Sequence, residues 1–375
     1  MPRAWAEVDL AAVRHNVGLL VAEAAPAVVC AVVKADGYGH GAVPVARAAT
    51  DAGAAWLAVA SAEEGSELRA AGIDVPVLLL SEPAPDEVDE TVRLGLRATV
   101  YSEDGIEQLA KAVARAGGAP LAVHLKVDTG MRRIGAAAAA AVDRARAVLE
   151  RPELDLEGVW THLAVADEPT NRFTGEQLAR FDSVLATLSA AGVRPPLVHA
   201  ANSAATLVHP PARRDLVRCG IAVYGVPPAP ELAGCVALRP SLSLRARISL
   251  VRVVPRGDGI SYGLHHRCAA DSVIATVPIG YADGVTRALF RTGGEVLVGG
   301  RRRPLAGAIT MDQLMVDCGP AGDPSAEVVA AGDEVVLLGE QGDERITADE
   351  WAAKLGTIAY EVVCRIGPRV PRTYR

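Results

Sequence analysis

The chain has 375 residues, of which 50% are hydrophobic, and its formal net charge is −7. This length predicts more than one domain, and the acidic balance argues against general nucleic-acid binding, which needs a basic surface. The N-terminus lacks a signal-peptide pattern, and no charge-free apolar run is long enough to suggest a membrane span. The six cysteines form no C-x-x-C pair. We therefore expect buried, reduced thiols in a cytoplasmic protein, with no metal site.

Through about residue 225, short Val/Leu/Ala-rich runs alternate with stretches patterned as amphipathic helices. The runs predict eight strands, at 28–33, 56–60, 75–80, 96–101, 121–127, 157–162, 196–200 and 215–219. Ser61, with Glu64 three residues on, fits a capping box, and Ser102 fits the cap of the next helix. Strands that alternate with helices form parallel sheets, because parallel neighbours need crossovers. The pattern predicts a closed (β/α)8 barrel, with an open doubly wound sheet as the alternative.

After residue 235 the pattern changes to short β-rich runs separated by Gly, Pro and Asp turns. This change predicts a second, mostly β domain. We expect the barrel to span residues 1–236 and the β domain residues 237–375, and we leave open that the first few residues pack with the β domain. The basic cluster GGRRRP (299–304) is interpreted as a solvated hairpin turn.

Polar residues recur at the C-terminal ends of the predicted strands, where barrel enzymes have their active sites. They are Lys34, Lys126, Thr161 with His162, Asn202 with Ser203, and Arg218. Each has a structural alternative: a solvated rim charge for Lys34, a pair with Asp128 for Lys126, a core histidine for His162, a helix cap for Ser203, and an ion pair for Arg218. Five such coincidences at one face are harder to explain by packing than any one alone.

The residue types at this face suit one kind of cofactor. A strand-end lysine in an apolar setting suits a Schiff base, because desolvation favours the neutral, nucleophilic amine. The serine after the seventh strand and the glycine after the eighth suit a phosphate, which barrels bind in those loops. A phosphate site together with a Schiff-base lysine predicts pyridoxal phosphate (PLP).

Nine segments resemble, in order and spacing, the motifs of bacterial alanine racemases, and the match runs from Trp5 to Arg372. They are AVVKADGYGHG, KVDTGMRRIG, WTHLAVADEP, HAANSAATL, LVRCGIAVYG, GISYG, VPIGYADGVTR, ITMDQLMVD and AYEVVCRIGPRVPR. The resemblance implies a barrel followed by a β domain, in a PLP-dependent homodimer with shared active sites. It also implies that the enzyme interconverts L-alanine and D-alanine and supplies D-alanine for peptidoglycan.

The resemblance also implies residue roles. Lys34 holds the cofactor as an internal aldimine and serves one face of the substrate Cα, while Tyr262 of the partner subunit serves the other. The further cofactor contacts that it implies are Tyr38, His162, Asn202, Ser203, Arg218, Gly220, Ile221 and Tyr360. The substrate contacts that it implies are Arg133, Met311, Asp312 and Tyr281. Lys126 is expected to be carbamylated, as in many family members, with the pair to Asp128 as the alternative.

An arginine at the cofactor ring has a chemical consequence. A guanidinium stays protonated and only donates hydrogen bonds, so Arg218 keeps the ring nitrogen an unprotonated acceptor. The ring is then a weaker electron sink than with a carboxylate partner, which disfavours transamination. Because a free tyrosine titrates near pH ~10, Arg218 acting through His162 is expected to stabilise the phenolate of Tyr262.

Three positions depart from the family's usual motifs. Cys219 replaces a proline, Thr310 replaces a common cysteine, and Asp36-Gly37 replaces the commoner Asn-Ala. Competing interpretations are a PLP-dependent decarboxylase, a racemase of broader specificity, and a non-catalytic PLP-binding protein. The C-terminal domain with Tyr262 and Tyr281 argues against the last of these.

Overall fold

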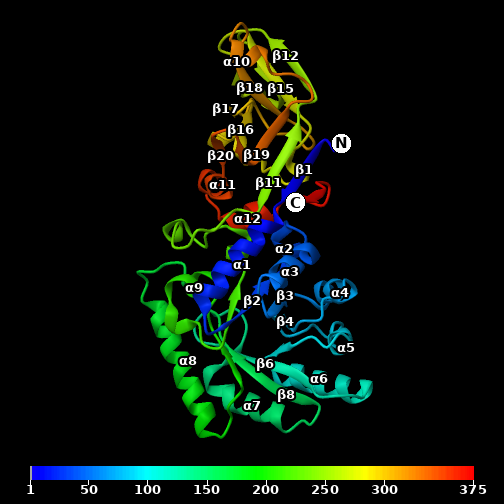
Figure 1. Ribbon diagram of the computed structural model, residues 1–375, viewed down its shortest axis with the longest axis vertical. Helices are drawn as coiled ribbons and strands as arrows, with labels where there is room; N and C mark the ends of the chain where they lie inside the picture. Colours follow the sequence, from blue (N-terminus) through cyan, green and yellow to red (C-terminus); the bar gives the residue numbers. More distant parts are fainter. Residues whose placement is uncertain (1) are drawn as a thin grey trace. The chain divides into compact units, whose positions relative to one another are not determined.

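The computed structural model describes residues 2–375, and the chain divides into two compact units. The barrel unit comprises residues 11–37 and 41–240, and the β unit comprises the N-terminal residues through Leu10, residues 38–40 and residues 241–375. The first is α/β and the second is mostly β (Figure 1). Among residues 2–375, no helix is long and apolar enough to cross a membrane.

The barrel unit contains all eight predicted strands, in parallel register. They are β2 (Val28–Val32), β3 (Trp56–Val59), β4 (Val77–Leu79), β5 (Ala98–Val100), β6 (Leu121–Asp128), β8 (Leu154–Trp160), β9 (Leu197–His199) and β10 (Leu216–Cys219). They pair in the orders β10-β2-β3-β4 and β5-β6-β8-β9. A parallel bridge between Leu78 and Arg97 joins β4 to β5, and the Asp215 N–H donates to the Val198 carbonyl at the other seam. The ring is closed, so the barrel prediction is confirmed and the open-sheet alternative is wrong.

Helices follow the strands of the barrel unit, with bounds α1 (Leu10–Ala24), α2 (Lys34–Gly39), α3 (Ala42–Asp51), α4 (Ala62–Ala70), α5 (Val88–Arg93), α6 (Glu103–Ala116), α7 (Ala141–Leu149), α8 (Phe173–Ala190) and α9 (Ser203–Val208). The predicted caps of α4 and α6 are confirmed. The Ser61 hydroxyl accepts the Glu64 N–H, and the Ser102 hydroxyl accepts the Gly105 N–H. Each satisfies a backbone donor that the first helical turn leaves without a partner.

The turn after β2 is left-handed. All five residues from Ala35 to Gly39 have φ between 50° and 79°. A left-handed backbone costs an ordinary L-residue roughly 1–2 kcal/mol, and glycine avoids that cost. Gly37 and Gly39 therefore relieve part of the strain. Lys34 lies at the start of this turn, and contacts with other segments have to stabilise its conformation.

Gly39→Ala is expected to destabilise the protein more than Gly72→Ala. The two glycines have φ of 79° and 74°, so both substitutions carry the left-handed backbone cost. A Cβ at residue 39 would lie 2.7 Å from the Val363 carbonyl oxygen, whereas a Cβ at residue 72 meets nothing within 4 Å. Thermal unfolding should show the lower Tm for Gly39→Ala, by a few degrees for roughly 1–3 kcal/mol of added strain. Equal Tm values would contradict the close approach.

The β unit is built on a sheet of order β17-β16-β19-β11-β1-β21, with β20 beside β19. Its strands are β1 (Ala4–Val8), β11 (Leu242–Arg247), β16 (Glu295–Val298), β17 (Arg301–Pro304), β19 (Glu334–Gln341), β20 (Glu344–Ile346) and β21 (Arg372–Tyr374). A second sheet contains β12 (Leu250–Val254), β15 (Ser272–Val277) and β18 (Leu314–Pro320), and β13 (Gly259–Ile260) pairs with β14 (His266–Arg267). The short helices are α10 (Pro324–Glu327), α11 (Ala348–Leu355) and α12 (Ala359–Cys364). β1 lies between β11 and β21, so both ends of the chain complete this sheet (Figure 1).

The basic cluster 299–304 forms the predicted hairpin. Residues 299 and 300 are glycines with φ of 60° and 72°, which suits a two-residue turn between β16 and β17. Arg301 is exposed, but Arg302 and Arg303 are half-buried. Arg302 pairs with the carboxylates of Glu295, Glu344 and Glu350. The expectation of a solvated cluster is therefore wrong for two of its three arginines.

All six cysteines are free thiols, but they are not all buried. Cys30, Cys219, Cys268 and Cys318 lie inside the protein, as expected. Cys235 and Cys364 are exposed, so the expectation is wrong for them. Burial raises the pKa of Cys219 to about 12, which makes this thiol a poor nucleophile at neutral pH.

Candidate active site

Three of the predicted strand-end residues gather around one tryptophan of the barrel. Trp160 ends β8, and its ring centroid lies 4.0 Å from Lys126 Nζ and 4.4 Å from Arg218 Cζ. His162 follows β8, and Arg218 Nη2 lies 3.3 Å from its Nδ1. Lys34, the second residue after β2, is near enough for its charge to lower the pKa values of Lys126 and His162. The carboxyl end of the barrel thus concentrates positive charge.

Arg218 is buried, and three acceptors fix its guanidinium in addition to the contact with His162. Nη2 donates to the carbonyls of Thr161 at 2.8 Å and Ala200 at 3.1 Å, and Nη1 donates to His199 Nδ1 at 2.9 Å. Within residues 2–375 no carboxylate pairs with Arg218, so the ion-pair alternative is wrong, and no acceptor faces its Nε–H. Burial lowers the pKa of Arg218 to about 10. The side chain therefore remains a cation at neutral pH, and its Nε–H is available to donate to a ligand.

Lys126 is a buried amine in an electropositive setting. Burial, followed by the charges of Arg218 and Arg133, lowers the pKa of Lys126 to about 7. Its Nζ lies 3.4 Å from the Leu80 carbonyl. Asp128 instead accepts the N–H groups of residues 130 and 132 and pairs with a guanidinium nitrogen of residue 132 at 3.6 Å. The alternative in which Lys126 pairs with Asp128 is thus not what the structure shows.

His162 is a neutral imidazole of defined tautomer. Burial, with the charges of Arg218 and Lys126, lowers its pKa well below the ordinary value. Because the Arg218 guanidinium can only donate, its approach to His162 Nδ1 favours the tautomer in which Nε2 carries the proton. His162 can therefore pass a hydrogen bond onward from Nε2 without itself becoming a cation.

Ser203 does not cap the helix that it begins. The cap of α9 is Asn202, whose Oδ1 accepts the Ala205 N–H at 3.0 Å, so the alternative of Ser203 as a cap is wrong. The buried Ser203 Oγ instead accepts the Gly220 N–H at 2.8 Å. The Gly220 amide is thus engaged within the chain, while Ile221 begins the 3-10 helix η3 (Ile221–Tyr224), where no upstream carbonyl of the helix can accept its N–H. The Ser203 hydroxyl proton and the Ile221 N–H are the donors left for an anion.

Glu64 has a role at this site that sequence reasoning missed. The expected capping box needs its carboxylate to accept the Ser61 N–H, but Oε1 accepts the Ala35 N–H at 2.6 Å and Oε2 accepts the Ala60 N–H at 2.7 Å. Glu64 therefore ties α4 to the residue after Lys34. This contact is one of those that hold the left-handed turn in place.

Tyr38 and Tyr360 are brought together in the β unit. Their ring centroids are 6.3 Å apart at an interplanar angle of 48°. Burial, with a smaller effect of Tyr360, raises the pKa of Tyr38, so its hydroxyl stays protonated. The pair offers phenolic hydroxyls from two distant segments of the sequence.

The other predicted residues of the β unit lie on three loops. Tyr262 begins η5 (Tyr262–Leu264) and is 71% exposed, and Tyr281 is 44% exposed. The Ala282 N–H donates to the Met311 carbonyl at 3.1 Å, so the loops of Tyr281 and Met311 lie together. Among residues 2–375 the Met311 N–H has no acceptor, whereas the Asp312 carboxylate is paired with an arginine of the β unit at 2.6 Å.

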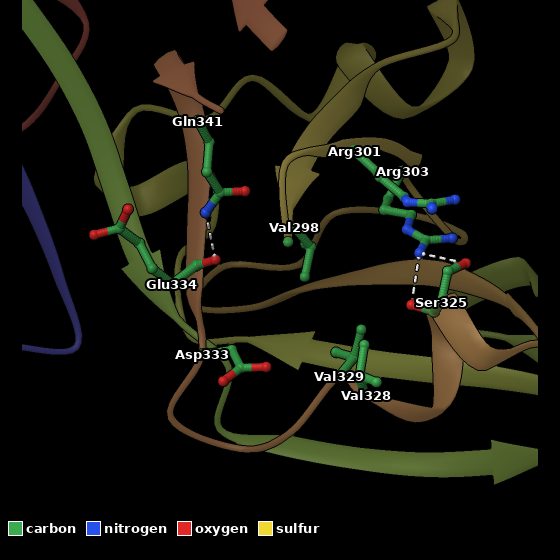
Figure 2. Close-up of a pocket in the computed structure, with 10 residues that line it drawn as sticks. Val298, Arg301, Arg303, Ser325, Val328, Val329, Asp333, Glu334 and Gln341 are labelled. Atoms are coloured by element: carbon green, nitrogen blue, oxygen red, sulfur yellow. Dashed lines mark hydrogen bonds between the residues drawn. The ribbon is translucent and has the colours of Figure 1, made fainter. Parts of the chain in front are cut away.

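Two of the clefts in the described part of the β unit differ in character. Tyr262, Ser261 and Thr310 help to line a cleft of about 900 Å³. Figure 2 shows the other, of about 420 Å³, where Arg303 donates to the Ser325 carbonyl at 2.8 Å and to its hydroxyl at 3.1 Å. The second cleft contains none of the residues predicted to form the active site.

Sequence reasoning missed two buried histidines. His124 and His199 are completely buried and contact each other inside the barrel, Nδ1 of the first to Nε2 of the second at 2.9 Å. His124 is two residues before Lys126 on β6, so strand alternation places both on one face. That alternation, read along LAVHLKV, was a signal that could have identified it.

The fold and site define a class of barrel enzyme, with cationic and hydrogen-bonding residues at the carboxyl ends of the strands and a β domain after the barrel. Residues 8–228 match the family model described as alanine racemase, N-terminal domain, and residues 241–374 match that described as alanine racemase, C-terminal domain. The chain therefore belongs to the alanine racemase family, a family of isomerases.

Full-length relatives agree with this assignment. The alanine racemase of Symbiobacterium thermophilum is 49% identical over 373 residues, which cover 99% of this chain and 96% of the relative. The crystal structure of alanine racemase from D-cycloserine producing Streptomyces lavendulae has a TM-score of 0.93 at 44% identity and covers 100% of this chain and 98% of its own. Alanine racemase from Bacillus anthracis with bound L-Ala-P has a TM-score of 0.92 at 39% identity, over 100% and 95% of the two chains.

Proposed function

We propose that the protein is a PLP-dependent racemase that interconverts L-alanine and D-alanine and so provides D-alanine for peptidoglycan. Family membership over nearly the whole length supports the reaction. The observation that carries the proposal is that a strand-end amine, Lys34, and a buried donor-only cation, Arg218, both stand at the carboxyl ends of strands of one closed barrel. A solved relative with bound L-Ala-P supports a small alanine-like substrate.

The residues present fit PLP. Lys34 would hold the aldehyde carbon through its amine, and the unused Nε–H of Arg218 suits an unprotonated ring nitrogen. The Ser203 hydroxyl and the Ile221 N–H would bind the phosphate. Gly220 would act indirectly, through the backbone N–H that it donates to Ser203, and Asn202 would act through its side chain, which caps α9. Tyr38 and Tyr360 are proposed as further phosphate ligands, and His162 as the neighbour of the ring.

PLP bound there would withdraw electrons from the substrate Cα and so make its proton removable. Arg218 limits that withdrawal, because a guanidinium does not protonate the ring nitrogen. A weaker electron sink favours return of the proton to Cα. The arrangement therefore suits racemisation better than transamination, and a decarboxylase would be expected to offer the ring an acid instead.

Racemisation needs a proton to leave one face of Cα and to be returned to the other. We propose that Lys34 serves one face and that Tyr262 from a second copy of the chain serves the other, in a homodimer with shared active sites. Two features of the Tyr262 loop support this role. Tyr262 is largely exposed, and its neighbours Ser261 and Leu264 have φ of 61° and 49°. Such strain costs non-glycine residues about 1–3 kcal/mol each and concentrates at functional sites.

Arg133 is proposed to bind the substrate carboxylate. It is exposed, and no ion pair occupies it within residues 2–375. The unpaired Met311 N–H would add a second donor, and Tyr281 would narrow the entrance to suit a methyl side chain. Asp312 would act indirectly, because its ion pair holds the Met311 loop in place.

Lys126 is proposed to be carbamylated by CO2. Only a neutral amine adds CO2, and a pKa of about 7 leaves much of the Lys126 amine neutral at physiological pH. The carbamate would place an anion among Lys34, Arg133 and Arg218, whose positive charges otherwise repel one another. It would also orient Arg133 toward the substrate.

Protein equilibrated with ¹³C-bicarbonate is expected to give one carbamate resonance in its ¹³C NMR spectrum. The resonance should be lost as the pH falls through about 7, because the Lys126 amine becomes protonated. Lys126→Ala should remove it, while Lys111→Ala, at an exposed lysine of α6, should not. A resonance that survives in Lys126→Ala would contradict the assignment.

The reaction itself is tested with purified protein of known oligomeric state, with and without added PLP. Chiral analysis should show D-alanine formed from L-alanine, and other amino acids should be converted far more slowly. Conversion of bulky amino acids at similar rates would indicate a broader racemase. Release of CO2 without inversion would indicate a decarboxylase and would overturn the proposal.

A further inference from the structure

The interior of the barrel is unusually polar. Barrel interiors are ordinarily filled by layers of branched aliphatic side chains, but here His124, His199, Arg218 and Lys126 are all at most 3% exposed. Burying such groups is unfavourable unless every one of them is hydrogen-bonded.

Four side chains form a continuous hydrogen-bonded chain through the barrel. Arg218 Nη1 lies 2.9 Å from His199 Nδ1, and His199 Nε2 lies 2.9 Å from His124 Nδ1. His124 Nε2 lies 3.0 Å from Glu157 Oε2. Arg97 completes the far end, with its Nε 3.4 Å from the same Glu157 oxygen. The chain thus leads from the candidate active site to a partly exposed carboxylate.

The direction of the hydrogen bonds is fixed by the two ends. A guanidinium only donates, so His199 Nδ1 accepts and its Nε2–H donates. His124 Nδ1 must then accept, and its Nε2–H donates to the Glu157 carboxylate. Both imidazoles are neutral and protonated on Nε2, and the opposite direction would require Arg218 to accept a hydrogen bond.

Local backbone and packing features build this chain. Val123 of β6 is opposite Leu156 of β8, but His124 is opposite Gly158, so Glu157 is the extra residue of a β-bulge. Bulges re-aim side chains, and this one accompanies the contact between Glu157 and His124. A Cβ at Gly158 would lie 2.3 Å from His124 Nδ1, so glycine leaves the space that the imidazole fills.

Two tryptophans hold the imidazole rings. Trp160 stacks on His199, with centroids 5.5 Å apart and an interplanar angle of 9°. Trp56 packs edge-on against His124 at 5.5 Å and 67°. Rings held in this way have little freedom to choose other hydrogen-bond partners, so the chain is preorganised.

The hydrogen-bonded series of side chains also supplies compensation for the buried positive charge of Arg218. Within residues 2–375 the guanidinium has no carboxylate in direct contact, and a buried charge needs compensation. Burial and the charge of Arg218 hold the pKa of His199 well below its ordinary value, and burial lowers that of His124. Burial opposes ionisation of Glu157, but the His124 hydrogen bond and the charge of Arg97 lower its pKa overall. The Glu157 carboxylate is thus a charged acceptor, and two neutral imidazoles connect it to Arg218 by hydrogen bonds.

We propose that Glu157, His124 and His199 are positioning residues for Arg218, which orient its guanidinium and supply its counter-charge from the opposite end of this hydrogen-bonded series. The consequence for catalysis rests on the proposed function. If Arg218 meets the ring nitrogen of PLP, the chain fixes the strength of that hydrogen bond. Through it, Glu157 influences a reaction that it does not touch.

The first test needs neither cofactor nor activity. In ¹⁵N-histidine-labelled wild-type protein, the imidazole NMR signals of His124 and His199 should show protonated Nε2 and unprotonated Nδ1. His124→Gln and His199→Phe identify the two signals. A protonated Nδ1 on His199 would overturn the proposal, because Arg218 could not then donate to it.

The second test is a double-mutant cycle on PLP-loaded protein. Glu157→Gln keeps an acceptor for His124 but removes the charge, and we expect kcat to fall several-fold, with a change in the absorption bands of bound PLP. His199→Phe keeps a ring on Trp160 but removes the acceptor of Arg218, and a displaced guanidinium is expected to reduce kcat by roughly 10²-fold. KM for alanine should change less than kcat in both variants. Asp155→Asn, an exposed carboxylate on the same strand, is the control and should leave both readouts unchanged.

The decisive comparison is Glu157→Gln in the His199→Phe background. Glu157 acts on Arg218 only through His199. Once His199→Phe has broken the hydrogen-bonded series, adding Glu157→Gln should therefore have little further effect on kcat or on the absorption bands. Independent, additive effects, or a Glu157→Gln variant that behaves like Asp155→Asn, would overturn the proposal. A wild-type protein that fails to bind PLP would refute the proposed function instead. The imidazole signals would still decide whether the hydrogen bonds from Arg218 to Glu157 exist.

Discussion

Lys34→Ala is expected to lower the racemisation rate by roughly 10⁴-fold or more, because the substitution removes both a covalent anchor and a proton-transfer group. Alanine cannot replace the amine, and the turn after β2 contains no other lysine. The fold should persist, since Lys34 is half-exposed at the start of α2. Initial rates of D-alanine formation, with circular dichroism to verify the fold, measure the effect.

Lys111→Ala provides the matched control for Lys34→Ala. Lys111 lies on α6 and pairs at the surface with Glu107 at 3.2 Å. An exposed pair of this kind contributes about 0–1 kcal/mol, so activity and stability should be nearly unchanged. A Lys34→Ala variant as active as Lys111→Ala would show that another amine carries out the reaction.

Tyr262→Phe is expected to lower racemisation in both directions by about 10²–10⁴-fold, the usual contribution of a positioned general acid or base. The substitution removes one hydroxyl from a side chain that is 71% exposed, so the free energy of unfolding should hardly change. PLP should remain bound, because the proposed cofactor contacts are elsewhere.

Exchange of the Cα proton in D2O separates a missing base from a damaged site. With Lys34 intact, one enantiomer of alanine should still exchange its Cα proton without inversion, while the other should not. Tyr374→Phe, at another exposed tyrosine of the β unit, is the control and should retain full activity. Unchanged racemisation by Tyr262→Phe would refute the two-base proposal.

The sequence predicted the barrel because its signals are local and repeated. Each strand is a short apolar run bounded by a turn, and Ser61 and Ser102 mark helix starts by their own side chains. The same reasoning placed Lys34, Lys126, His162, Ser203 and Arg218 at one end of the barrel, because parallel strands share a carboxyl edge.

Other features depend on contacts between distant segments, and no local pattern encodes them. Ser203 and Asn202 are both good helix caps, and only the approach of Gly220 shows that Ser203 is used otherwise. The Glu64 carboxylate satisfies the pattern of a capping box but bonds to Ala35, 29 residues away. Glu157 reaches His124 at a bulge, which strand alternation alone does not predict.

The site in the β unit was predicted by resemblance rather than by pattern. Tyr262, Tyr281 and Met311 lie on loops whose sequences carry no strong periodicity. The structure shows Tyr262 and Tyr281 exposed and the Met311 N–H without an acceptor among residues 2–375. These facts agree with the proposed roles of the three residues.

Borohydride reduction of the PLP-loaded wild-type protein, followed by peptide mapping, tests directly whether Lys34 is the residue that holds the cofactor. Reduction makes the bond between the cofactor and an amine permanent, and the chain contains only four lysines, at 34, 111, 126 and 354. We expect one modified peptide, which carries the pyridoxyl group on Lys34. A label on any other lysine, or no label on protein that racemises alanine, would contradict this expectation.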